Sequence, residues 1–187
     1  MDFNALAPLK SLSLLAVLFL SFSILFFSAY IFLYQPAASA CAQSGLSVVI
    51  SPNSDAEILD AMSSAKERIW LEMYLFTSTE IADKLVEMKK KGIDVKVLLE
   101  KRVVGGANMK MCDYLERGGV DVRWASATEF QLTHSKLIIV DGRAFVGSIN
   151  LSPSALKKNR EIDVLIADEK IVRELTDIFI SDWEKGA

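Results

Sequence analysis

The single histidine of this chain, His134, begins a short segment whose residue types could do chemistry on a phosphate group. Lys136 lies two residues after it, Asp141 follows an apolar run, and Ser148 and Asn150 belong to a Gly-Ser-x-Asn block. Because side chains alternate along a β-strand, a strand here places His134 and Lys136 on one face and Asp141 on the other. A lone His-x-Lys is a weak signal, but the added Asp and the Gly-Ser-x-Asn block argue against a chance match.

This pattern resembles the signature of the phospholipase D superfamily, His-x-Lys-x4-Asp followed by Gly-Ser-x-Asn. The resemblance is to the small members that carry the motif once, the secreted bacterial endonuclease and the mitochondrial cardiolipin hydrolase. It extends from about Val48 to Trp183. The interval between Asp141 and Gly147 is one residue shorter than is usual in the family.

A phosphodiester is anionic and a poor electrophile, so an enzyme must neutralise its oxygens, supply a nucleophile and protonate the leaving group. The resemblance implies a phosphodiesterase, a hydrolase in which His134 attacks phosphorus to form a phosphohistidine that water then hydrolyses. It also implies that Lys136 and Asn150 bind non-bridging oxygens and that Ser148 assists them. His134, Lys136, Asp141, Asn150 and Glu161 are therefore the candidate catalytic residues.

The two candidate carboxylates are expected to act differently. The alternation directs Asp141 away from His134, which predicts that it supports a neighbouring turn or cation. Glu161 precedes the alternating apolar segment 162–166 and shares a face with Asp163. The resemblance places a carboxylate there against the far nitrogen of the histidine, where it fixes the tautomer and raises the basicity of the ring. The alternative is that Glu161 is a strand residue that faces solvent.

Attack by one histidine leaves the departing oxygen without an obvious acid, because the chain has no second histidine. Relatives with two motifs solve this within one chain. A chain with one motif can solve it as a two-fold homodimer that brings both copies of His134 to one composite site. No cluster of His, Cys and carboxylate residues has the spacing of metal ligands, so neither a metal nor another cofactor is expected.

The N-terminal region has a different composition. There is no charged residue between Lys10 and Asp55, and residues 12–33 are almost wholly apolar. A helix of this length measures about 33 Å, which is enough to cross the hydrocarbon core of a bilayer. We therefore expect a membrane anchor over 1–34 that spans the bilayer through residues 12–33, a linker over 35–44 and one catalytic domain over 45–187.

Two fates remain open for this segment. Ala38-Ser39-Ala40 resembles a signal-peptide cleavage site, which would release a secreted protein, whereas the length of the apolar run favours a retained anchor. Lys10 before the span places the amino terminus in the cytoplasm and the catalytic domain outside. Cys41 and Cys112 permit one disulfide bond or none. Cys112 falls in a predicted helix and is more typical of a small buried residue.

Strands alternate with helices along the domain, which indicates an α/β fold with a mixed β-sheet layered with helices. The predicted strands cover 46–51, 69–76, 93–99, 120–124, the motif segment from His134, 144–146 and 162–166. The predicted helices follow capping boxes at Ser54–Glu57 and Thr77–Glu80, cover 108–117, and cover 170–183.

The formal net charge of −3 gives no overall basic field that would attract nucleic acid. Basic residues concentrate in the middle of the domain and either are solvated or line a groove: Lys89, Lys90, Lys91, Lys96, Lys101, Arg102, Lys110, Arg117 and Arg123. The leading hypothesis is a tethered endonuclease, and the alternative is a phospholipase D or cardiolipin hydrolase that acts on membrane phospholipid. A third hypothesis is an inactive, anchored dimer that binds nucleic acid, although the complete catalytic set argues against it.

Overall fold

The computed structural model describes Ser23 and residues 45–187, and the second part belongs to one compact unit, Gln43–Ala187. The strands are β1 (Leu46–Ile50), β2 (Arg68–Met73), β3 (Asp94–Leu99), β4 (Asp121–Trp124), β5 (Lys136–Val140), β6 (Arg143–Gly147) and β7 (Ile162–Ile166). The helices are α2 (Asp55–Ser63), α3 (Thr79–Lys90), α4 (Ala107–Arg117), α5 (Pro153–Lys157) and α6 (Glu169–Lys185), with a short 3-10 helix at Val104–Gly106.

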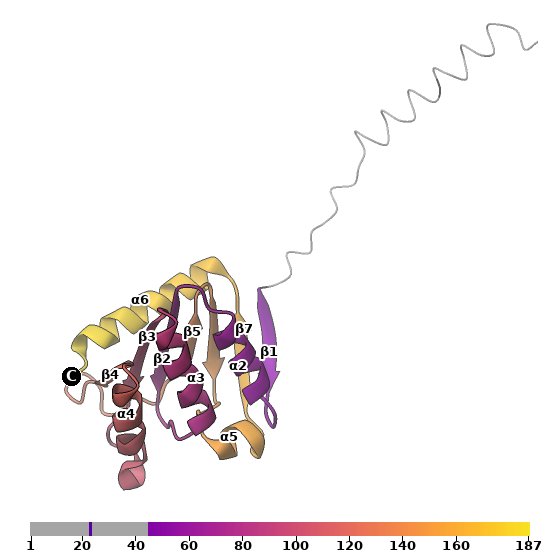
Figure 1. Cartoon of the computed structure of the whole chain (residues 1–187). Helices are drawn as coiled ribbons and strands as arrows, with labels where there is room; N and C mark the ends of the chain where they lie inside the picture. Colours follow the sequence, from indigo (N-terminus) through magenta and orange to yellow (C-terminus); the bar gives the residue numbers. More distant parts are fainter. Residues whose placement is uncertain (1–22, 24–44) are drawn as a thin grey trace, which may run out of the picture. The chain divides into compact units, whose positions relative to one another are not determined.

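The strands of the described part form one sheet in the order β1-β7-β6-β5-β2-β3-β4 (Figure 1). β2, β3 and β4 are parallel, and the other neighbouring pairs are antiparallel. The predicted mixed sheet is therefore confirmed. The carboxyl ends of β2, β3, β4 and β6 and the amino ends of β5 and β7 meet at one edge, where α5 also lies (Figure 1). Loops that follow parallel strands at such an edge commonly hold ligands.

Helices cover both faces of the sheet (Figure 1). On one face Ile69, Val97 and Ile138 form a buried cluster with apolar side chains of α2, α3 and α4. On the other face Leu137 and Phe179 belong to a second cluster beneath α6. Successive residues of β5 thus point to opposite helix layers, as the alternation of side chains along a strand requires. This central strand is buried along its whole length, which fixes the register of the motif.

Both predicted capping boxes are wrong in detail. Ser54 precedes α2 in a right-handed helical conformation rather than an extended one, and its side chain makes no capping hydrogen bond. An extended backbone is what aims the capping oxygen at the N–H groups of the first turn. For α3 the cap is Ser78, whose side chain accepts a hydrogen bond from the N–H of Ile81. Glu80 instead forms an ion pair with Lys157.

Two further elements differ from expectation. β2 ends at Met73, and Phe76 forms only an isolated bridge with Leu151. The Phe76 N–H donates a hydrogen bond to the Asn108 side chain, so it is not available to a partner strand. The helix α5 was not predicted. The sequence feature that indicates this helix is Ser152 followed by Pro153. The Ser152 side chain caps the helix by accepting a hydrogen bond from the Ala155 N–H, and proline is favourable in the first turn of a helix.

The predicted anchor over 1–34 and linker over 35–44 lie outside the described residues, apart from Ser23. Within the described part, no helix has the length and hydrophobicity needed to span a membrane. Cys112 is a buried free thiol on α4, and Cys41 lies outside the described residues.

Candidate active site

His134 and Lys136 meet at the amino end of β5. The Lys136 ammonium lies 2.9 Å from Nδ1 and 3.2 Å from Nε2 of His134, and it donates a hydrogen bond to the His134 carbonyl oxygen at 2.6 Å. The Tyr74 ring packs against the imidazole, with the ring centroids 4.3 Å apart, and the Lys136 Nζ lies 5.1 Å from the same Tyr74 ring. Lys136 is buried while His134 is exposed. The imidazole is therefore accessible to a substrate, and the ammonium is held beside it.

Two carboxylates at the start of β7, Glu161 and Asp163, contribute to the charge around Lys136. Burial lowers the pKa of Lys136 below its usual range, although the charges of Glu161 and Asp163 partly oppose this effect. Asp163 is 2% exposed, and burial raises its pKa to about 6, against the opposing hydrogen bonds from the Ile149 and Ser148 N–H groups. The Lys136 ammonium, which is expected to bind phosphate, thus lies in a partly desolvated environment, where its attraction for an anion is stronger than in water.

Glu161 is held beside Ser148. The Ser148 hydroxyl donates to Glu161 Oε2 at 2.6 Å, and Asn159 Nδ2 donates to Oε1 at 3.1 Å. Among the described residues these are the side-chain partners of Glu161, and the hydrogen bonds of the His134 ring are with Lys136. The structure therefore brings Glu161 to the site through Ser148, whereas the resemblance had placed a carboxylate directly against the imidazole.

Asn150 follows β6 at the same edge and is half-buried. Its Oδ1 is buried and has no hydrogen-bond partner among the residues that the structure describes. Buried polar atoms without partners are rare in folded proteins. This oxygen is an acceptor, so a phosphate oxygen would have to accept a hydrogen bond from the Asn150 Nδ2 group instead.

Asp141 lies at the opposite end of β5 from His134. Its carboxylate accepts hydrogen bonds from the N–H groups of Lys66, Glu67 and Arg68 at 2.8, 3.0 and 2.9 Å. Burial by itself raises the pKa of Asp141, but these three N–H groups outweigh it and hold the pKa below its usual range. These contacts tie the hairpin after β5 to the turn before β2.

Several residues that shape the site were not singled out as such from the sequence. Tyr74 was assigned only to a strand, and Ser51 only to the end of one. The Ser51 hydroxyl donates to the Asn159 carbonyl oxygen at 2.8 Å and accepts from the Glu161 N–H at 3.1 Å, which fixes the loop that carries Glu161. Tyr74 was detectable as the aromatic residue that directly follows a buried strand; no local pattern connects Ser51 with a loop more than a hundred positions later.

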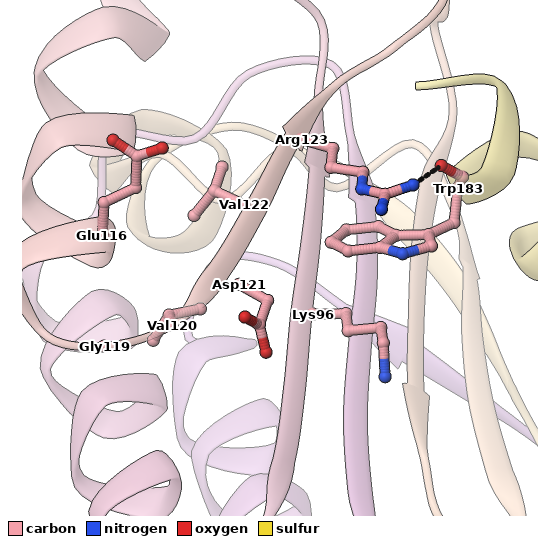
Figure 2. A pocket seen from close by; sticks show the side chains of 8 residues that line it. All are labelled: Lys96, Glu116, Gly119, Val120, Asp121, Val122, Arg123 and Trp183. Carbon is pink, nitrogen blue, oxygen red and sulfur yellow. Dashed lines mark hydrogen bonds between the residues drawn. The ribbon is translucent and has the colours of Figure 1, made fainter. Parts of the chain in front are cut away.

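Most of the basic residues in the middle of the domain have acidic partners. The pairs are Lys89 with Asp121, Lys91 with Glu87, Lys96 with Asp94, Arg102 with Glu100, and Arg117 with Asp113. A pocket of about 590 Å³ lies along the edge strand β4, where the Arg123 guanidinium lies over the Trp183 ring and donates to the Trp183 carbonyl oxygen (Figure 2). None of its lining residues belongs to the His134 site.

The described residues contain no group of three or more His, Cys, Asp and Glu side chains arranged to hold a metal ion.

Comparison with known proteins identifies the family to which the chain belongs. Residues 58–183 match the family described as the PLD-like domain of cardiolipin synthase. The chain belongs to the phospholipase D superfamily. The single motif makes it one of the superfamily members that carry the motif once, and its enzymatic class is that of a phosphodiesterase.

Three relatives show the extent of the similarity. A phospholipase D of Rickettsia bellii is 27% identical over 148 residues, which cover 78% of this chain and 70% of that protein. A mitochondrial cardiolipin hydrolase of Danio rerio is 24% identical over 68% of this chain and 56% of its own length. The crystal structure of Nuc from Salmonella typhimurium, a phospholipase D family member, superposes with a TM-score of 0.70 at 32% identity, covering 76% of this chain and 95% of that one.

Proposed function

We propose that this phosphodiesterase is an endonuclease that hydrolyses nucleic acid without a metal ion, through a phosphohistidine at His134. The observation that carries the proposal is the contact between the exposed His134 imidazole and the buried Lys136 ammonium, 2.9 Å apart. A nucleophile and a cation held together at an open edge are what attack on an anionic phosphodiester needs.

The reaction takes place in two displacements. One ring nitrogen of His134 attacks phosphorus, and the bond to the leaving oxygen breaks while Lys136 and the Asn150 amide bind the non-bridging oxygens. The leaving oxygen takes a proton from the imidazolium of His134 of the partner subunit. Water, deprotonated by that same imidazole, then attacks the phosphohistidine and regenerates the free His134. Glu161 accepts the Ser148 hydroxyl hydrogen bond and interacts electrostatically with Lys136.

Support for the two-fold composite site comes from the surface beside Glu161. The side chains of Leu46, Val48, Ile50 and Ile162 are 49%, 61%, 47% and 53% exposed. Because β1 pairs with β7 so that Leu46, Val48 and Ile50 lie opposite Ile166, Val164 and Ile162, these side chains share one face of the sheet. Exposed apolar faces mark sites that contact a protein or a membrane, and here we propose that a second copy of the chain covers this face.

Exposed cations at the site edge favour nucleic acid over a single phospholipid headgroup. Lys101 follows β3, Lys110 lies in the first turn of α4, and Lys158 and Arg160 lie between α5 and β7. A polyanionic strand can contact several such residues at once, releasing counterions at each phosphate. The phospholipid alternative is favoured by the names of the Rickettsia bellii and Danio rerio relatives and by the predicted membrane span over 12–33.

The test uses the full-length chain in detergent, incubated with EDTA and, separately, with single-stranded DNA, RNA and vesicles that contain cardiolipin. We expect cleavage of a nucleic acid and, after acid-free quenching, a phosphorylated protein that is absent from His134→Asn. The matched control is Asp177→Asn on the exposed side of α6, which should behave as the wild type. Hydrolysis of the vesicles alone would favour the phospholipase, and unchanged turnover in His134→Asn would exclude catalysis by this residue.

The composite site has its own test. Wild-type and His134→Asn chains are unfolded together, refolded at varied ratios and assayed at constant total protein. If each site needs both histidines, activity falls with the square of the wild-type fraction. A linear fall would show that each subunit works alone.

In this proposal the domain lies outside the cytoplasm, tethered through residues 12–33 or secreted after cleavage.

A further inference from the structure

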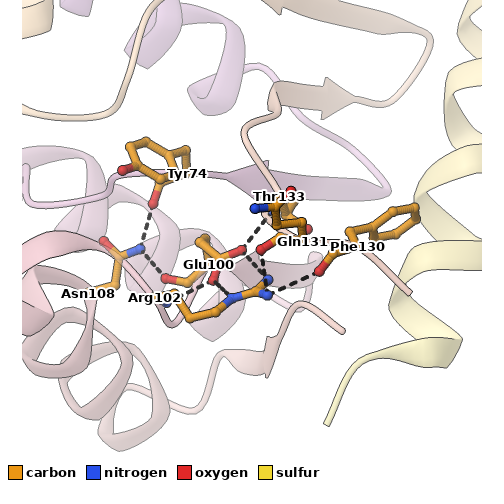
Figure 3. A network of polar contacts seen from close by, with 7 residues as sticks. All are labelled: Tyr74, Glu100, Arg102, Asn108, Phe130, Gln131 and Thr133. Atoms are coloured by element: carbon orange, nitrogen blue, oxygen red, sulfur yellow. Dashed lines mark hydrogen bonds and ion pairs between the residues drawn. The ribbon is translucent and has the colours of Figure 1, made fainter. Parts of the chain in front are cut away.

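A polar network with a buried carboxylate at its centre lies next to the site, on the loops that follow β3 and precede β5 (Figure 3). At its centre is Glu100, which is fully buried. Its carboxylate accepts hydrogen bonds from Arg102 Nε at 2.7 Å, from an Arg102 terminal nitrogen at 2.8 Å and from the Arg102 backbone N–H at 2.7 Å. It also accepts from the backbone N–H of Thr133 at 2.7 Å, and Thr133 is the residue immediately before His134.

The same guanidinium reaches the loop that leads to His134. The other terminal nitrogen of Arg102 donates to the carbonyl oxygens of Phe130 and Gln131, at 3.0 and 2.7 Å. Arg102 thus connects the end of β3 to two successive residues of this loop, while Glu100 holds a third (Figure 3). Together these bonds fix the backbone from which His134 projects.

A second arm of the network reaches the imidazole through Tyr74. Asn108 is 1% exposed, and its Nδ2 donates to the carbonyl oxygens of Tyr74 and Glu100, at 2.8 and 2.9 Å. Its Oδ1 accepts from the Phe76 N–H at 2.9 Å. This amide therefore stops the strand ladder at Tyr74 and sets the backbone that carries the Tyr74 ring against His134.

We infer that Glu100, Arg102 and Asn108 are positioning residues for His134, which they hold from two sides, through Thr133 and through the Tyr74 ring. The inference rests on the proposed role of His134 as nucleophile. An in-line attack on phosphorus tolerates little displacement of the nucleophile, and an error of about 1 Å can reduce a rate about 100-fold. Glu100 and Asn108 are buried, Arg102 covers them from the exposed side, and the side-chain polar atoms of all three are paired, as a rigid support requires.

Arginine is required in this role because of its geometry. A guanidinium presents several N–H groups in a fixed plane, so it can bind a carboxylate on one side and two carbonyl oxygens on another. Lysine keeps the charge next to Glu100 but cannot reach both partners at once. Arg102→Lys therefore separates the loop from β3 without leaving a buried carboxylate unpaired.

The experiment follows the single histidine directly. In the full-length chain with isotope-labelled histidine, the ring Cε1–H signal belongs to His134 alone, so its chemical shift and titration curve report the environment of the nucleophile. We compare the wild type with Arg102→Lys and Asn108→Ala, and with Arg173→Lys, an exposed arginine on α6 that pairs with Glu169. Thermal unfolding measures stability separately, and kcat and KM are measured on the substrate that the wild type cleaves.

We expect the His134 signal and its titration midpoint to move in Arg102→Lys and Asn108→Ala, with kcat lowered at least about tenfold and KM changed less than about threefold. Arg173→Lys should change neither. If folded Arg102→Lys keeps the wild-type signal, titration curve and kcat, the inference is wrong. Should Asn108→Ala not fold, Arg102→Lys still decides. A wild type without turnover on any substrate would contradict the proposed function, while the His134 signal would still report the network.

Discussion

Glu72, on β2, and Glu100, directly after the neighbouring strand β3, are both buried glutamates, yet their environments are opposite. Glu72 is 5% exposed on β2, and burial together with the charge of Asp182 raises its pKa to about 7, against one opposing hydrogen bond from Ser135. Burial also raises the pKa of Glu100, but the hydrogen bonds from Arg102 and Thr133 outweigh it and lower the pKa to about 2. The comparison shows that partners, and not burial alone, decide the charge of a carboxyl group in this core.

The difference fixes the sign of each contribution to stability. The Glu100 pKa is depressed, so its contribution is present above the unfolded pKa near 4.5 and is lost as the pH falls towards 2. The Glu72 pKa is raised, so its contribution is present below 4.5 and is lost as the pH rises through 7. At neutral pH and above, Glu100 therefore stabilises the fold and ionised Glu72 weakens it.

Removing the Glu100 carboxylate should cost the most stability. Glu100→Gln removes the charge that Arg102 and Thr133 bind, and we expect the free energy of unfolding at pH 7 to fall by about 3 kcal/mol. Urea denaturation of the full-length chain measures this. Glu57→Gln, on the exposed side of α2, serves as the control and should change little. The deficit should shrink below pH 4.5; a deficit that persisted unchanged at pH 3 would contradict the depressed pKa.

Substitution of Glu72 is expected to stabilise the fold at high pH, whereas substitution of Glu100 destabilises it. Glu72→Gln is nearly isosteric and replaces a buried ionised group, so we expect unfolding at pH 8 to require about 2 kcal/mol more than in the wild type. Well below pH 4.5 Glu72 is protonated in both the folded and the unfolded wild type, so the wild type and Glu72→Gln should unfold alike. The control is Glu174→Gln on the exposed side of α6. Destabilisation at pH 8 would mean that Glu72 has a cationic partner, and the contrast with Glu100 would disappear.

A smaller change is expected at Asp141, a half-buried carboxylate whose hydrogen-bond partners among the described residues are three backbone N–H groups. Asp141→Asn keeps one acceptor oxygen but loses the charge, and we expect a loss of about 1 kcal/mol at pH 7. Because the Asp141 pKa is depressed, this loss should fade as the pH falls below 4. Asp60→Asn, exposed on α2, is the matched control in the same denaturation series. If Asp141→Asn lowered the free energy of unfolding as much as Glu100→Gln, backbone N–H groups would stabilise a carboxylate as strongly as a guanidinium does, and the expected order would be wrong.

Much of the site could be predicted from the order of residues. The motif located His134, Lys136, Ser148 and Asn150, and the structure gathers them at one edge of the sheet. Their placement follows from the alternation of side chains along β5 and β6, which is a local property. Local patterns were less reliable at Ser54 and Thr77, where the backbone conformation and the neighbouring Ser78 decided which group caps a helix.

The order of residues was enough to predict the α/β layering, the motif strand and the separation of Asp141 from the pair His134 and Lys136, because strand alternation and fixed spacing act within a few residues. The contact of Glu161 with Ser148, the link that Arg102 makes between β3 and the loop before His134, and the difference in pKa between Glu72 and Glu100 became visible in the folded chain. Those contacts join segments that are distant in the chain, and the desolvation and hydrogen bonds that set them exist only once the sheet and its helices have packed.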